Sequence, residues 1–101
     1  MKTSITERKH EQVIDFLNQY LHLKDTKLLS IPELLLSIEL HVDGIARYRA
    51  KQWILEWQQA HRNRVMFMPT SDVWAIRKRT WEKWYIHYNN VWQSHIRVIR
   101  A

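Results

Sequence analysis

The chain contains no cysteine, which excludes disulfide bonds, thiolate metal sites and cysteine nucleophiles. It has one glycine and two prolines among 101 residues. Sheet proteins need many tight turns, so this scarcity favours a few long helices. No uninterrupted apolar run approaches the roughly 18 residues of a membrane span, and the polar first ten residues lack the apolar core of a signal peptide. We therefore expect a cytoplasmic protein without membrane segments.

Charge is present, but it is unevenly distributed. The net charge is +6. Residues 1–46 hold five Lys/Arg and seven Asp/Glu, whereas residues 47–101 hold eleven and three. Ten of the twelve aromatic residues also follow Ala46. The length predicts a single domain, 1–101, with a leucine-rich acidic half (1–44) and a basic, aromatic-rich half (45–101).

Apolar residues recur at helical spacing along most of the chain. The pattern predicts helices over about 5–23, 30–42, 45–62 and 72–99, with Ser4 and Glu7 forming a capping box at the first start. Residues 65–69 end in proline and are predicted to be an extended linker. The expected fold class is therefore all-α: a compact bundle of about four helices with a long, Trp/Tyr-rich C-terminal helix.

The second predicted helix is apolar on most sides. Its large apolar residues are Leu34, Leu35, Leu36, Ile38, Leu40 and Val42. They cannot all face one direction, so we expect this helix to lie in the bundle core or in a homodimer interface.

The basic second half predicts contact with a polyanion, because Lys and Arg neutralise phosphates. We interpret the protein as a small, non-enzymatic nucleic-acid-binding or regulatory protein, with DNA and RNA both left open. The predicted phosphate-contacting residues are Arg47, Lys51, Arg62, Arg77, Lys78, Arg79, Lys83 and Arg97. A helix-turn-helix over 30–57 is a poor fit, since its first helix would be almost wholly apolar.

An alternative uses the same residue types differently. Trp, Tyr and Arg dominate protein interfaces, so the chain could be a protein-binding module, an inhibitor or a small subunit that docks on an acidic partner. Tyr48 and Leu55 would then be the docking anchors, because they flank the basic stripe of the third helix.

Catalytic and metal-binding signatures are not visible. The sequence has no glycine-rich phosphate loop, nucleophile elbow or paired-carboxylate motif. None of the six histidines is spaced i, i+4 from another, which is the usual spacing for metal ligands on a helix. We therefore expect no enzymatic activity, no metal and no cofactor.

Overall fold

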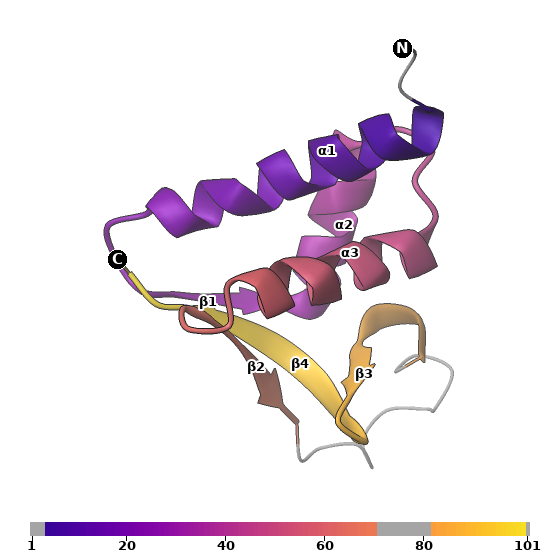
Figure 1. The fold of residues 1–101 in the computed structure, drawn as a ribbon. Helices are drawn as coiled ribbons and strands as arrows, with labels where there is room; N and C mark the ends of the chain where they lie inside the picture. The colour runs from indigo at the N-terminus through magenta and orange to yellow at the C-terminus, as the bar shows by residue number, and fades with distance from the viewer. Residues whose placement is uncertain (1–3, 71–81, 101) are drawn as a thin grey trace.

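A computed structural model describes residues 4–70 and 82–100. Helices α2 (Ile31–His41) and α3 (Arg47–Ala60) cover one face of an antiparallel sheet, and α1 (Ile5–Asn18) packs on these two helices (Figure 1). A 3₁₀ turn, η1 (Gln19–His22), extends α1. The strands are β1 (Lys27–Ser30), β2 (Val65–Pro69), β3 (Ile86–Tyr88) and β4 (Val91–Val98).

The first three helices begin close to where the sequence predicts. The Ser4 hydroxyl accepts a hydrogen bond from the Glu7 backbone N–H at 3.1 Å, which confirms the capping interaction. Helix α2 starts directly after Ser30 with a proline in its first turn. Helix α3 buries Ala50, Trp53, Ile54 and Trp57 on the side that faces the core.

The all-α bundle is wrong, because the second half of the chain supplies most of a four-stranded sheet. The predicted long C-terminal helix is replaced at residues 86–98 by a β3–β4 hairpin. Asn89 and Asn90 both have positive φ, 54° and 62°, which suits a two-residue turn between twisted strands. The predicted linker at 65–69 is strand β2, and β1 at 27–30 was not predicted at all.

Strand β4 is the centre of the sheet. Its residues 95–98 pair with β1 on one side and with β2 on the other. Gln93 pairs with both Ile86 and Pro69, so β3 lies opposite β2 and continues the line of β1. The register shifts between Met68 and Pro69, which marks a β-bulge near Ser94.

The core lies between the helices and the sheet. Val13 and Leu17 of α1, Leu35 and Ile38 of α2, and Trp57 of α3 are almost fully buried, together with Ile96 and Val98 of β4. Helix α2 is thus largely buried against the rest of the chain, but Leu36 and Leu40 remain 43% and 87% exposed. None of the described helices is long and apolar enough to cross a membrane.

Candidate nucleic-acid interface

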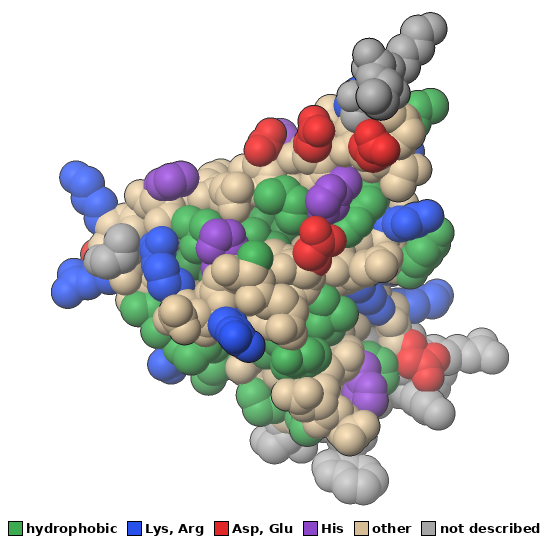
Figure 2. All heavy atoms as spheres, viewed as in Figure 1, with side chains coloured by type: hydrophobic (Ala, Val, Ile, Leu, Met, Phe, Trp, Pro, Cys, Tyr) green, Lys and Arg blue, Asp and Glu red, His purple; other side chains and the backbone are tan. Residues whose placement is uncertain are grey.

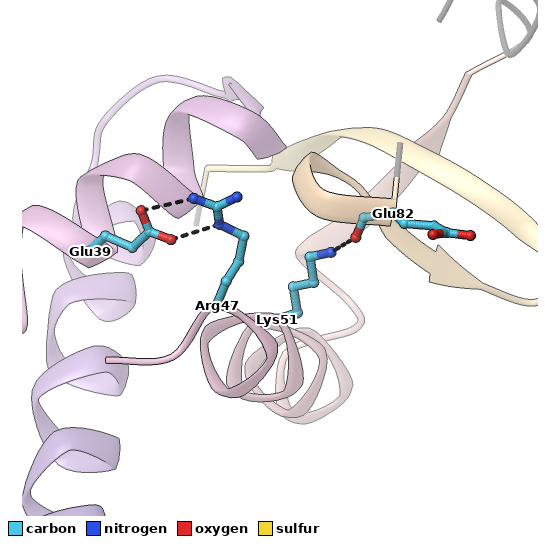
Figure 3. A network of polar contacts seen from close by, with 4 residues as sticks. All are labelled: Glu39, Arg47, Lys51 and Glu82. Carbon is cyan, nitrogen blue, oxygen red and sulfur yellow. Dashed lines mark hydrogen bonds and ion pairs between the residues drawn. The ribbon is translucent and has the colours of Figure 1, made fainter. Parts of the chain in front are cut away.

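Two of the predicted phosphate ligands hold the chain together instead. The Arg47 guanidinium donates to both carboxylate oxygens of Glu39 on α2, at 2.7 and 3.3 Å (Figure 3). Its other side covers the Trp84 ring, 3.9 Å from the ring centroid. Such a cation is already neutralised by a carboxylate and stacked on an aromatic ring, so it has little left to offer a phosphate.

Lys51 lies one helical turn further along α3. Its ammonium donates to the backbone carbonyl of Glu82, just before β3 (Figure 3). Burial, and secondarily the nearby positive charge of Arg47, lower the pKa of Lys51 below its ordinary value. Both residues therefore connect α3 to its neighbours.

A different set of cations gathers at the C-terminal end of β4, away from the β3–β4 turn. We call it the basic end; its members are Lys24, Lys27, Arg62, Arg64, Arg97 and Arg100. Strand pairing brings Lys27 and Val65 to the two sides of Val98. The Arg100 N–H donates to the Thr26 hydroxyl at 3.4 Å, which closes the C-terminal segment against the turn after η1.

Arg64 fixes the geometry of this end. Its guanidinium donates to the Ile99 carbonyl at 3.1 Å and to the Leu21 carbonyl at 2.7 Å. The Ile99 N–H returns a hydrogen bond to the Arg64 carbonyl at 2.7 Å. One side chain thus joins three segments that are far apart in sequence, and the remaining five cations are exposed around it.

The charge balance of the basic end is one-sided. The three segments that form it, residues 22–27, 61–66 and 97–100, contain six Lys/Arg and a single acid, Asp25. Acidic residues lie elsewhere, with Glu7, Glu11 and Asp15 along α1. Figure 2 shows several Lys and Arg side chains at the end where the C-terminus lies, others on the opposite side, and acidic side chains along α1. The basic end is therefore a locally positive surface.

The other predicted phosphate ligands are not brought together with these. Arg62 and Arg97 belong to the basic end, whereas Lys83 is exposed just before β3, near the other end of β4. Arg77, Lys78 and Arg79 lie outside the described residues. Lys24 and Lys27 were not among the predicted ligands, because they precede the basic half of the chain. They lie near Arg97 only because β1 pairs with β4.

The predicted docking anchors do share a feature. Tyr48 and Leu55 both line a shallow groove of about 350 Å³ between α3 and the β3–β4 hairpin. Its other lining residues include Lys51, Tyr85, His87 and Trp92, and the lining is mostly apolar. Tyr48 is 66% exposed at the groove's rim. The groove is a candidate protein-binding surface, separate from the basic end.

No group of three or more potential metal ligands is found in residues 4–70 and 82–100. His10 pairs with Glu56 at 3.2 Å, and the His87 ring lies 4.9 Å from the Trp92 ring at a tilt of 53°, so these histidines have structural partners. No known protein family, characterised protein or solved structure is detectably similar to this chain.

Proposed function

We propose that the protein is a non-enzymatic nucleic-acid-binding protein whose basic end contacts phosphates. The observation that carries this proposal is the convergence of five exposed cations around Arg64 with only one acidic residue among them. Within the described residues, no carboxylate is paired with any of the five. Neutralising phosphates with unpaired cations releases the counterions of a nucleic acid, and this release is the usual source of such affinity.

The dipole of helix α3 also favours a positive charge at the position of Arg62. Arg62 follows the C-terminus of α3, where the helix dipole is negative and stabilises a cation. Arg62 is therefore held without an acidic side chain, which leaves its charge available to a ligand. An acidic protein would meet the same charges, so the test must separate the two partners.

The decisive experiment is a titration of the protein into fluorescent oligonucleotides over a range of salt concentrations. If five phosphates are contacted, log K should fall with log [salt] at a slope of roughly −4.5 on duplex DNA. Arg62→Glu should weaken binding about tenfold and reduce the slope by about 1, because one phosphate contact is lost.

Arg8→Glu is the matched control. It changes the net charge by the same amount, but Arg8 is exposed on α1 beside Glu7 and Glu11. Its affinity should stay near that of the parent. If the parent binds no nucleic acid at low salt, the proposal is wrong.

The groove supports a second candidate function, docking of a protein partner through Tyr48 and Leu55. The specific observation is that two anchors selected from sequence line the same apolar groove. Aromatic anchors in a pocket commonly dominate protein interfaces. Tyr48→Ser should abolish capture of a protein partner and leave nucleic-acid affinity unchanged, whereas Arg62→Glu should do the reverse.

A further inference from the structure

The face of the sheet opposite the helices carries two rows of side chains. Strand register places Leu28, Arg97 and Met66 side by side across β1, β4 and β2. The next row along is Ser30, His95 and Met68. The intervening row, Leu29, Ile96 and Phe67, packs in the core, so alternation turns the two named rows outward. We call these six residues the outer sheet face.

Three of the six residues of this face, Leu28, Met66 and Met68, are apolar, where a solvent-facing strand is normally polar. Leu28 is 60% exposed, and it neighbours Arg97 directly across the strand pair. Met66 flanks Arg97 on the other side and is half-buried. A lone exposed leucine needs no explanation, but here Leu28 and Met66 flank a cation that belongs to the basic end. Charge and apolar surface are interleaved within one face.

The second row of the outer sheet face adds the imidazole ring of His95. His95 lies between Ser30 and Met68, half-exposed, and its Nδ1 is 2.9 Å from the Ser94 hydroxyl. That hydrogen bond restrains the imidazole on the sheet surface. A restrained flat ring beside thioether and leucine side chains is suited to contact with another flat, apolar surface.

We infer that the outer sheet face binds the bases of a single-stranded nucleic acid whose phosphates lie on the basic end. This inference rests on the proposed function and specifies its ligand. A duplex presents phosphates but hides its base faces in the stack, so it could use only the cations. A single strand presents both groups, and its exposed bases gain from apolar and ring contacts.

An anionic membrane is the other ligand that combines charge with apolar groups. Insertion requires an apolar element that reaches several ångströms below the headgroups. Here Leu28 is the one strongly exposed apolar residue of the outer sheet face, and the rest of the face is the flat surface of a sheet. The shape therefore favours a ligand that lies along the face over one that it must penetrate.

The test compares four probes at one salt concentration: a single-stranded oligonucleotide, its duplex, an abasic strand of the same length, and vesicles containing phosphatidylserine. The base-bearing single strand should bind roughly tenfold or more tightly than the duplex or the abasic strand. The double variant Leu28→Gln/Met66→Gln should remove that advantage and leave duplex affinity unchanged. Leu40→Gln is the matched control, because Leu40 is 87% exposed on α2, outside the outer sheet face.

Each result has one consequence. Equal affinity for base-bearing, abasic and duplex probes, still sensitive to Arg62→Glu, overturns the base-contact inference and leaves the proposed function standing. Binding to vesicles that depends on Leu28, with no preference for the single strand, also overturns it. Absence of binding to every nucleic acid defeats both proposals. Circular dichroism of the double variant verifies that the sheet persists.

Discussion

The two groups of cations, one at the start of α3 and one at the basic end, contain the same residue types in opposite situations. Arg47 and Lys51 lie in the first two turns of α3, where the helix dipole disfavours positive charge and no acidic residue of the helix offsets it. Glu39, Trp84 and the Glu82 carbonyl supply the compensation. At the basic end, Arg62 follows a helix C-terminus and needs no such partner.

The contrast between the two groups shows that a ligand-binding surface is identified by cations whose charge is not already neutralised within the protein. The number of Lys and Arg alone does not identify it. A cation placed against an unfavourable field is neutralised internally and then connects elements of the fold. Arg62, which lies in a favourable field, remains exposed. Within the basic end the same division recurs, since Arg64 is structural and its five neighbours are exposed.

The largest expected effect is on Arg64. Arg64→Ala removes two charged hydrogen bonds and leaves the carbonyls of Leu21 and Ile99 without this donor. We expect a loss of about 2–3 kcal/mol in the free energy of unfolding, measured by urea denaturation. Arg62→Ala, two residues away and exposed, should change stability by less than about 0.5 kcal/mol.

Arg64→Lys separates charge from geometry at the same position. Lysine keeps the positive charge but lacks the planar fork that reaches two carbonyls at once. It should lose part of the stability and keep the salt dependence of nucleic-acid binding. Equal stability of the Arg64→Ala and Arg62→Ala variants would show that Arg64 does not fix the basic end.

A smaller effect is expected at Arg47. Arg47→Gln removes the ion pair with Glu39 and the contact with Trp84, at a cost of about 1–2 kcal/mol because the pair is partly buried. A double-mutant cycle with Glu39→Gln should return a coupling free energy of roughly 1 kcal/mol. Nucleic-acid affinity should change little. A loss of affinity as large as that of Arg62→Glu would support the predicted basic stripe of α3 as a binding surface. It would contradict the contrast between the two groups of cations.

The three helices of the first sixty residues follow from local signals. Capping at Ser4, the proline after Ser30 and the spacing of Trp53 and Trp57 all act within a few residues, so the sequence predicts those helices. The sheet depends on pairing between segments that are distant in the chain. Lys27 and Val98 are adjacent in space but 71 residues apart in the chain. The spacing of apolar residues within either segment does not predict this pairing.

The second half of the chain misleads for a specific reason. Trp84, Tyr88, Val91, Trp92 and Ile96 satisfy three- and four-residue spacing as well as they satisfy strands. Asn89-Asn90 is the signal that decides, because two consecutive residues that tolerate positive φ favour a hairpin turn. The abundance of β-branched and aromatic residues around it also favours strands.

The candidate site could be predicted only in part. Net charge and its location in the second half identify Arg62 and Arg97 as candidates, but Lys24 and Lys27 enter through the pairing of β1 with β4. The same pairing creates the outer sheet face by turning Leu28 outward. Helical geometry placed Arg47 and Lys51 on a solvent-facing stripe, because the periodicity of α3 does not reveal their partners in α2 and in the segment before β3.

The smallest expected effect concerns alkaline pH, and it distinguishes the environment of Lys51 from that of an exposed lysine. Burial, then the charge of Arg47, lower the pKa of Lys51 from its ordinary 10.5, while Glu82 opposes the shift. Folding therefore favours neutral Lys51. Its contribution to stability is fully present above pH 10.5 and is lost as pH falls through the lowered pKa.

Tyr20 acts with the opposite sign, which allows the two residues to be separated. Burial raises the pKa of Tyr20 above 10.0, so its contribution is present below pH 10.0 and is lost as pH rises through the raised pKa. Urea denaturation between about pH 8 and pH 11 should show that the free energy of unfolding of Tyr20→Phe increases relative to that of the parent above pH 10.0.

The free energy of unfolding of Lys51→Met should decrease relative to that of the parent as pH approaches 10.5, because the parent alone gains stability by releasing that proton. Adding Arg47→Gln should shrink the Lys51 effect by removing its second cause. If Lys51→Met keeps a constant difference from the parent across this range, Lys51 is as solvated as the lysines of the basic end, and the contrast between the two groups of cations fails at that residue.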